Sequence, residues 1–281
     1  MEALPRLKAR TASLHELRDL FRALRAMAAS HVQEAQDALA GIREYVGVVE
    51  ESIAEAAGLL ARAPDGLARE VAGDSSALVV VCSEHGFAGA FNERLLDRAA
   101  ETRQPGQDLL VIGSRGAALA EERGLELAGS FAMATHVGGI LGVTRRVADR
   151  LASVATADVV FGSYKKGGGY AVAARRILPL DPALLAGAEG RSPPLHHLEP
   201  ALLLQRLAGE YLFAEITRAV MESFASENAA RLRTMEAADR NIDDKLGDLQ
   251  RRANALRQEA ITEELLDVVT GSEAILRASR S

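Results

Sequence analysis

Residues 211–276 decide the fold, and they read YLFAEITRAVMESFASENAARLRTMEAADRNIDDKLGDLQRRANALRQEAITEELLDVVTGSEAIL. The stretch contains no proline, and only Gly247 and Gly271 interrupt a composition that favours helix. Apolar residues recur in alternating steps of three and four, with the polar Asn228 in the same row: Met221, Phe224, Leu232, Met235, Ala238, Ile242, Leu246, Leu249, Ala253, Leu256 and Ala260. This period predicts a narrow apolar seam that faces another helix. At about 1.5 Å per residue, the helix would be on the order of 100 Å long and would need a partner along its length.

The first 62 residues repeat this pattern. From Leu4 to Leu60, apolar residues again recur in steps of three and four, and Pro5 lies early enough for a first helical turn. The pattern ends at Ala63-Pro64-Asp65-Gly66, which is typical of a helix break. We therefore expect the two terminal helices to pack on each other in antiparallel orientation, with the middle of the chain bridging them.

The middle of the chain has a different pattern, in which short β-branched runs alternate with amphipathic stretches. We expect strands at 77–82, 109–112, 158–164 and 170–178, and helices at 91–100, 117–123 and 143–154. Residues 127–144 are expected to hold a further buried strand and a glycine-rich turn. The alternation predicts a small α/β, Rossmann-like domain. The predicted organisation is thus an N-terminal coiled-coil helix (1–62), an inserted α/β domain (75–198) and a C-terminal coiled-coil helix (199–281).

The composition of the chain argues against several classes of function. The net charge of −6 argues against general binding to nucleic acid, which needs a basic face. The single cysteine, Cys82, rules out a disulfide within the chain and fits a small buried residue in a reducing compartment. The N-terminal residues lack the apolar run of a signal peptide. We expect a soluble cytoplasmic protein that meets a membrane only through a partner.

Neither glycine loop carries a phosphate-binding fingerprint. Gly86–Gly89 and Gly113–Gly116 follow expected strands, but neither matches GxGxxG or the P-loop motif. Tight turns that allow close strand–helix packing are therefore favoured over a cofactor site. His85 and the pair His196-His197 lack an accompanying ligand or catalytic set, so no catalytic, cofactor or metal site is predicted. The acidic residues of the second long helix are expected on its solvated face: Glu227, Glu236, Asp239, Asp243 and Asp244.

Basic residues gather on both long helices. Arg18, Arg22 and Arg25 share one face of the first helix. The second helix carries Lys245, Arg251, Arg252 and Arg257. Antiparallel packing would bring both clusters to the same end. Two interpretations remain open, a solvated face or a surface that holds acidic loops of a partner.

Several segments resemble the gamma subunit of F-type ATP synthases. ESFASENAARL at 222–232 is similar to the family's ESxxSEHAARM, and SEHGFAGAFN at 83–92 is similar to its SDRGLxGGxN. LRAMAASH at 24–31 stands where members carry MKMVAASK. Further residues match LQxxxNxxRQxxITxELxxIVxG in register: Leu249, Gln250, Asn254, Arg257, Gln258, Ile261, Thr262, Glu264, Leu265, Val269 and Gly271. Arg25, His31, Glu236 and Ala255 replace family lysines, which indicates a divergent bacterial branch.

The resemblance implies a central-stalk rotor subunit without catalysis or cofactors of its own. Its asymmetric shaft would turn inside the ring of α and β subunits and couple ion flow through the membrane c-ring to ATP synthesis or hydrolysis. It implies α, β, ε and c-ring partners, and a peripheral place on the cytoplasmic face of the inner membrane. The implied contacts with the α3β3 collar are Arg25, Met27, Arg252, Arg257, Gln258 and Glu264. The coupling ion, H⁺ or Na⁺, is selected by other subunits.

Two other functions stay open from the residues alone. The first is a nucleotide-using α/β enzyme with helical dimerisation arms, which the glycine loops favour and the missing fingerprint weakens. The second is a coiled-coil tether, which accounts for the long helices but not for the α/β insertion.

Overall fold

The structure is a computed structural model, and it describes residues 3–61, 75–165, 167, 169–185 and 196–278. The predicted helix break at residues 63–66 lies outside this part. Two long helices flank the sheet-containing middle of the chain, α1 (Ala3–Ala61) and α6 (Pro200–Ala278). α6 continues without a break through both Gly209 and Gly247.

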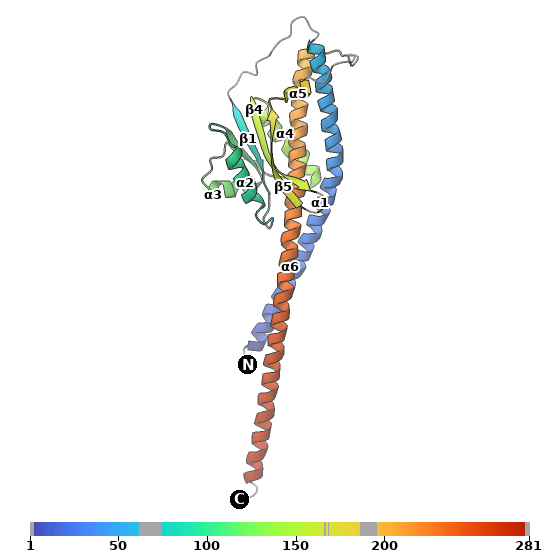
Figure 1. Cartoon of the computed structure of the whole chain (residues 1–281). Helices are drawn as coiled ribbons and strands as arrows, with labels where there is room; N and C mark the ends of the chain where they lie inside the picture. The colour runs from blue at the N-terminus through green and yellow to red at the C-terminus, as the bar shows by residue number, and fades with distance from the viewer. Residues whose placement is uncertain (1–2, 62–74, 166, 168, 186–195, 279–281) are drawn as a thin grey trace. The chain divides into compact units, whose positions relative to one another are not determined.

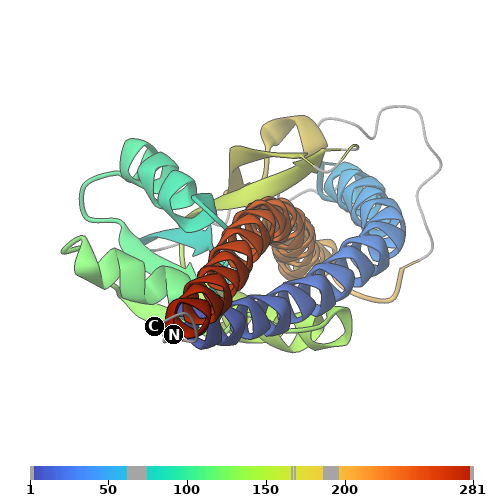
Figure 2. The ribbon, with the colours of Figure 1, turned by 90° about the horizontal axis from the view of Figure 1, so that it is seen from below.

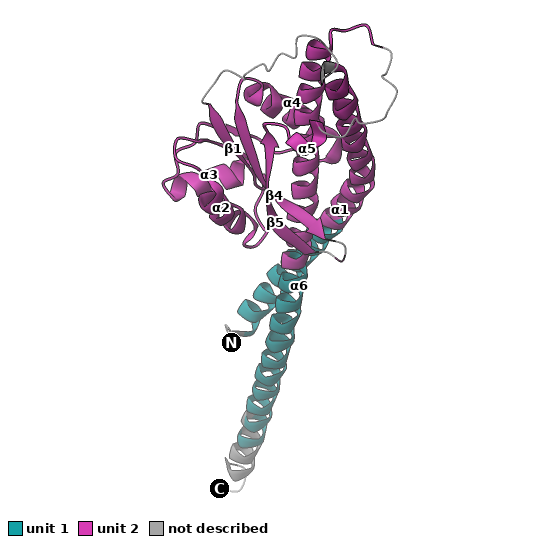
Figure 3. Ribbon diagram, turned by 45° about the horizontal axis from the view of Figure 1, so that its top comes forward, with its two compact units in different colours: residues 1–26, 235–281 teal, residues 27–234 magenta. Residues whose placement is uncertain are grey.

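The chain divides into two compact units, and α1 and α6 contribute to both (Figure 3). Unit 1 contains residues 1–26 and 235–281, and unit 2 contains residues 27–234. The domain boundaries predicted from the sequence describe another division, by chain segment, and they stay a prediction.

Unit 1 is an antiparallel helix pair. Arg18 of α1 contacts Asp243 of α6, whereas Arg25, further along α1, contacts the earlier Asp239. Rising numbers on one helix therefore meet falling numbers on the other. The predicted seam is buried on the α6 side at Met235, Ile242, Leu246 and Leu249. The 3.5-residue repeat thus places its apolar row against the partner helix, as expected.

Unit 2 contains a five-stranded sheet with the order β3-β2-β1-β4-β5. The strands are β1 (Ser76–Val81), β2 (Asp108–Ile112), β3 (Gly129–Phe131), β4 (Thr156–Lys165) and β5 (Gly169–Leu178). The first four pair in parallel, and β5 pairs antiparallel with β4. Val80 lies opposite Val111 of β2 and Val160 of β4. β1 and β2 are buried on both faces, which explains their nearly continuous runs of valine, leucine and isoleucine.

Helices cover both faces of the sheet (Figures 1 and 2). α2 (Phe91–Thr102) and α3 (Ser114–Glu122) pack on the face of Leu78 and Val80. α4 (Ile140–Leu151), α6 and α1 pack on the face of Val79 and Val81. The short α5 (Pro182–Leu185) follows β5. The chain therefore combines an antiparallel pair of terminal helices with an inserted α/β sheet of Rossmann-like order, as predicted.

The narrow-seam interpretation fails for one part of α6. Within residues 211–230, every residue is buried or nearly so, including Glu215, Glu222 and Glu227. The reason is that this part of α6 lies between α1 on one side and the sheet on the other. A helix enclosed in this way buries its whole circumference, not a single stripe. The expected solvated face therefore does not exist at Glu227.

Two further expectations need correction. The strand within residues 127–144 is only the three-residue β3, which is half-buried at the sheet edge and not a buried strand. α4 begins at Ile140, earlier than predicted, after a 3₁₀ turn at Val137–Gly139. The short edge strand carries little apolar signal, because a strand with one free edge and one solvated face is not selected for a continuous apolar run.

Candidate functional site

The crevice where an open α/β sheet usually binds a ligand is filled by α6. Such crevices lie at the carboxyl ends of strands, where the strand order reverses, here between β1 and β4. The Ser223 hydroxyl donates to the Val81 carbonyl oxygen at 2.6 Å and accepts from the Gly162 N–H at 3.2 Å. The Ser226 hydroxyl donates to the Gly162 carbonyl oxygen at 2.8 Å. The matched segment of α6 thus bridges the two strands in the place of a ligand.

Gly162 allows this close approach, so we expect Gly162→Ala to destabilise unit 2 by about 1–3 kcal/mol. An added Cβ would lie 2.7 Å from Ser226 Cβ and 2.8 Å from Phe91 Cε2, closer than side-chain carbons approach. Urea unfolding of the full chain measures the loss. The matched control is Gly142→Ala on α4, where an added Cβ meets nothing within 4 Å. An equal effect of both substitutions would show that the contact with α6 is not the cause.

A second place for an anion, the N-terminus of α3, is taken by the chain's own carboxylate. Glu84 Oε2 accepts from the Ser114 N–H at 3.0 Å and from the Met133 N–H at 2.7 Å. Its Oε1 accepts from the Ser114 hydroxyl at 2.7 Å. Burial alone would raise the pKa of Glu84, but these hydrogen bonds outweigh burial and lower it. Glu84 is therefore charged at neutral pH and occupies the position that a phosphate takes in nucleotide-binding folds.

The glycines of the second loop serve packing. A Cβ on Gly116 would lie 2.0 Å from Cys82 Cβ, and one on Gly113 would lie 2.6 Å from the Cys82 carbonyl oxygen. Gly113 also has a φ of +104°, which disfavours other residues. The predicted role of these glycines in close strand–helix packing is confirmed. Cys82 is buried as predicted, and burial raises its thiol pKa, so it is not a nucleophile at neutral pH.

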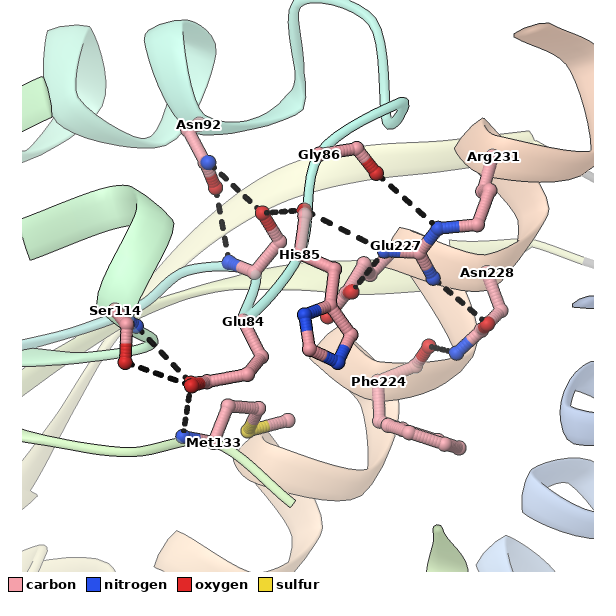
Figure 4. Close-up of polar contacts among 11 residues, drawn as sticks. Glu84, His85, Gly86, Asn92, Ser114, Met133, Phe224, Glu227, Asn228 and Arg231 are labelled. Carbon is pink, nitrogen blue, oxygen red and sulfur yellow. Dashed lines mark hydrogen bonds and ion pairs between the residues drawn. The ribbon is translucent and has the colours of Figure 1, made fainter. Parts of the chain in front are cut away.

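The loop of residues 83–90 (the 83–90 loop) is fastened to α6 (Figure 4). Its first residue is joined to α2: the Ser83 N–H donates to Asn92 Oδ1 at 2.9 Å, and Asn92 Nδ2 donates to the Ser83 hydroxyl at 2.8 Å. From α6, the Arg231 guanidinium donates to the carbonyl oxygens of Gly86 at 3.3 Å and His85 at 3.5 Å. The two segments that carry the most specific family motifs therefore contact each other.

Arg231 is held in turn by two neighbours on α6. It donates to Asn228 Oδ1 at 2.9 Å and forms an ion pair with Glu227 Oε1. Glu227 is only 4% exposed. Burial raises its pKa to about 7; Arg231 offsets part of this rise and the nearby Glu84 adds to it. Glu227 is thus a buried acid that changes charge near neutral pH.

In unit 1, the two helices are joined by an arginine–aspartate ladder. Arg18 donates to Asp243 Oδ1 at 3.2 Å and Arg22 donates to Asp239 Oδ1 at 3.2 Å. Arg25 lies 3.7 Å from Asp239 Oδ2. The three arginines share one face, as predicted, but Asp239 and Asp243 are not on a purely solvated face, because both pair with α1. Partly exposed pairs of this kind set the register of the helices more than they add stability.

A cationic groove lies between the helices of the same unit. It has a volume of about 310 Å³, and its lining comes from both helices: Lys8, Thr11, Ala12 and His15 of α1, and Gln250, Ala253 and Arg257 of α6. Ala12 of α1 and Ala253 of α6 have small side chains, and they leave room for the groove between the helices. Three of these lining side chains are basic, and none of the seven is acidic. In contrast to the ladder, the lining of this groove contains no carboxylate.

The six predicted collar residues lie in three different kinds of environment. Arg257 lines the cationic groove. Arg25 joins the ladder and keeps 43% of its side chain exposed. Met27, Arg252, Gln258 and Glu264 are exposed on the surface. Sequence reasoning missed Lys8 and His15, although Lys8, Ala12 and His15 recur at helical spacing on one face of α1. Only the antiparallel register shows which part of α6 they meet.

Within the residues that the structure describes, no group of three or more His, Cys, Asp and Glu side chains is arranged to hold a metal ion. None of the described helices has a stretch apolar and long enough to cross a membrane.

Comparison with known proteins agrees on one family. The family model described as ATP synthase matches residues 3–275. The ATP synthase gamma chain of Frankia casuarinae is 30% identical over 288 residues, covering 95% of each chain. That of Geotalea uraniireducens is 26% identical, covering 98% of this chain and 99% of the relative.

Solved structures give the same fold. A chain from the central stalk and c-ring of the Tetrahymena thermophila mitochondrial ATP synthase aligns with a TM-score of 0.58 and 21% identity, covering 78% of this chain and 99% of that chain. A chain of the Euglena gracilis mitochondrial enzyme aligns with a TM-score of 0.56 and 17% identity, covering 90% and 97%. The chain belongs to the ATP synthase gamma chain family.

Proposed function

We propose that this chain is the central-stalk rotor subunit of an F-type ATP synthase. Turning of its helix pair inside the ring of α and β subunits would couple ion flow through the c-ring to ATP synthesis or hydrolysis at the β sites. The observation that carries the proposal is the antiparallel pairing of the two terminal helices, in a chain that matches gamma chains over almost its whole length. The pair buries a shared seam, so it resists bending better than one helix.

The surface of unit 1 supports contact with an α3β3 collar. Near its end, α6 exposes apolar side chains on more than one face, and Ile261, Leu265 and Val268 are each more than half exposed. Large apolar side chains gathered on a helix surface mark an interaction site. The cationic groove adds positive charge, which fits acidic loops of a partner. We assign the collar contact to the six residues predicted from the family, which are Arg25, Met27, Arg252, Arg257, Gln258 and Glu264. To these we add Lys8 and His15 of the cationic groove.

The chain's own part is mechanical under this proposal. The ligand crevice of its sheet is filled by Ser223 and Ser226, and the anion position at α3 is filled by Glu84. Both features speak against the alternative of a nucleotide-using enzyme. Nucleotide chemistry would belong to the β subunits, and the rotor would bias their conformations in turn, which is a coupling free energy between distant sites. A simple tether would leave the whole sheet domain of unit 2 without a role.

We assign the remaining partners and the location by the same family argument. The ε subunit and the c-ring are the proposed partners of the rest of the chain. The protein would be peripheral, on the cytoplasmic face of the inner membrane, and would meet the lipid phase only through the c-ring.

Co-expression tests the proposal. A tagged copy of this chain is expressed with the α and β subunits from the same genome, and the complex is isolated through the tag. We expect both subunits to copurify, with ATPase activity that the chain alone lacks. A chain that assembles with neither subunit would refute the proposal. A nucleotide-induced rise in the melting temperature of the chain alone would favour an enzyme.

Charge reversal in the cationic groove is expected to weaken coupling. Arg257→Glu should lower the coupled turnover of the assembled complex about tenfold, which corresponds to the loss of roughly 1.4 kcal/mol of interaction. Because Arg257 is exposed, the isolated variant should unfold at the same urea concentration as the isolated wild-type chain. The matched control is Arg240→Glu, an exposed α6 arginine outside the groove. Equal turnover in wild type and the Arg257 variant would exclude an essential role for this groove.

A further inference from the structure

Part of the helix pair in unit 1 carries positive charge without matching negative charge (Figure 3). Residues 3–15 of α1 and 249–258 of α6 together contain six Lys and Arg, and neither stretch contains an Asp or Glu. The chain as a whole has the opposite balance, with a net charge of −6. Like charges on neighbouring helix surfaces repel each other, so an anion that lies between these stretches would stabilise the pair.

The cationic groove collects part of this charge from both helices. Lys8 and His15 come from α1, and Arg257 comes from α6. Among the residues that the structure describes, none forms an ion pair with these three side chains. By contrast, each arginine of the ladder lies 3.7 Å or less from an aspartate oxygen, and Arg251 pairs with Asp248. The basic side chains of the groove are therefore available to a ligand.

The donors in the groove suit an oxyanion. A lysine ammonium and an arginine guanidinium only donate, and a histidine ring has at least one N–H in either charge state. Gln250 donates one amide hydrogen to Asn254 at 3.2 Å and keeps a second. Thr11 already donates its hydroxyl to the Leu7 carbonyl oxygen at 2.9 Å. Several donors around one small space favour a compact acceptor with several charged oxygen atoms, such as phosphate.

We propose that the cationic groove binds inorganic phosphate, or the phosphate group of a larger molecule, and that the bound oxyanion joins Lys8 and His15 of α1 to Arg257 of α6. Binding requires both helices in their paired positions, so it stabilises the first turns of α1 against opening. The proposal rests on unit 1 alone and does not depend on the rotor function. In an assembled complex, acidic side chains of a partner would compete for the same donors.

Linkage sets the size of the expected effect. A surface groove that offers a few charge-assisted hydrogen bonds should bind phosphate with a dissociation constant on the order of 1 mM. An open form in which the first turns of α1 are unfolded lacks the donors of α1, so phosphate binds the closed form. At about ten times the dissociation constant, phosphate should therefore reduce this opening about elevenfold.

Hydrogen exchange of the isolated full chain measures the opening. The amides of residues 7–15 report it, because each lies far enough inside α1 to donate to a carbonyl oxygen four residues earlier. Exchange is compared at one pH with phosphate and with sodium chloride at equal ionic strength, and calorimetry with phosphate gives the dissociation constant. Phosphate should slow the exchange of these amides by the factor that linkage requires, and chloride should not.

Four variants locate the binding site. Lys8→Gln and Arg257→Gln should each weaken phosphate binding about tenfold and remove most of the protection of residues 7–15. The effect of Arg257→Gln is the sharper test, because this residue lies on α6 whereas the protected amides lie on α1. Arg10→Gln on α1 and Arg240→Gln on α6 are the matched controls, since both arginines are exposed and lie outside the groove. Both controls should keep the binding and the protection.

ADP distinguishes the two sources of the phosphate group. Protection by ADP at a lower concentration than by phosphate assigns the groove to a phosphate ester, and the reverse order assigns it to the free ion. A nucleotide effect that Arg257→Gln abolishes arises in this groove and does not favour a nucleotide-using enzyme.

Three results would overturn the proposal. The first is unchanged exchange with phosphate, and the second is equal protection by chloride at the same ionic strength. The third is protection that persists in Lys8→Gln and Arg257→Gln or is lost equally in the controls, because general screening of charge would then be the cause. None of these results would affect the copurification with the α and β subunits that tests the rotor function.

Discussion

Glu215→Ala is expected to destabilise unit 2 by roughly 3–5 kcal/mol. Glu215 is 1% exposed, and its Oε2 accepts from Arg175 of β5 at 3.1 Å and from Arg218 of α6 at 2.7 Å. Arg218 keeps only 15% of its side chain exposed. Removal of the carboxylate would leave this guanidinium charged and buried without its partner, and that state accounts for most of the expected loss. Arg175 is more exposed, so water can replace its contact.

Urea unfolding followed by tyrosine fluorescence measures this loss, because the chain has four tyrosines and no tryptophan. Glu210→Ala is the control, since Glu210 lies one turn away on α6 but is exposed and pairs with Tyr45. It should lower the stability by less than about 1 kcal/mol. The pair of substitutions Glu215→Met and Arg218→Met should recover much of the loss, because an apolar pair needs no buried charge. A Glu215 variant as stable as the Glu210 variant would contradict the expectation.

The geometry of this cluster explains why the double substitution should succeed. Glu215 Oε1 and Arg218 Nε are both buried, and neither has a hydrogen-bond partner among the described residues. A buried ion pair that leaves polar atoms unsatisfied contributes less than its charges suggest. Breaking one side is nevertheless costly, since the remaining charge stays in place. The cluster therefore specifies how α6 meets β5 more than it stabilises the contact.

Glu227→Gln is expected to stabilise the protein at pH 8 by roughly 3 kcal/mol. The folded-state pKa of about 7 exceeds the unfolded value of 4.5, so folding binds a proton between these values. The stability from protonated Glu227 is present below about pH 4.5 and is lost as the pH rises through about 7. Glutamine resembles the protonated acid in shape and charge, so it keeps that stability at every pH. The substitution should therefore change little near pH 4.5.

Thermal or urea unfolding at pH 5, 6, 7 and 8 compares the two proteins, and the wild-type profile should fall toward pH 7 while the variant profile is flatter. Glu236→Gln, at a partly exposed glutamate of α6, is the matched control and should leave the wild-type profile unchanged. A glutamine variant that is less stable than wild type at pH 8 would show that the ion pair with Arg231 outweighs the burial of the charge.

The sequence pattern predicted helices and strands well where their packing requires a regular arrangement of apolar residues along the chain. The strands beginning near Ala77 and Leu109 were predictable because both faces of a central parallel strand are covered, which selects an unbroken apolar run. The helix pair of unit 1 was predictable because a two-helix contact repeats every 3.5 residues. β3 was missed in detail, since three half-buried residues at a sheet edge carry no such repeat.

The residues of the candidate site likewise include some that the sequence predicted and some that it missed. Arg257 and Arg25 were found through a motif that resembles the family, whereas Lys8 and His15 belong to no motif and become relevant only through the register of α1 on α6. Glu227 was predicted on the solvated face because helical spacing sets it apart from the seam. The sheet covers that face instead, and no local pattern of α6 records it.

The amino-acid sequence by itself determined two long terminal helices, their antiparallel seam, the strand–helix alternation between them and the family. These features depend on periodicity, and periodicity is a property of neighbours along the chain. Only the tertiary structure decided that Ser223 and Ser226 fill the ligand crevice, that Glu227 is buried beside Arg231, and that basic residues of both helices share one groove. Each of these depends on contacts between segments far apart in the chain, where burial and charge pairing are set by distance in space.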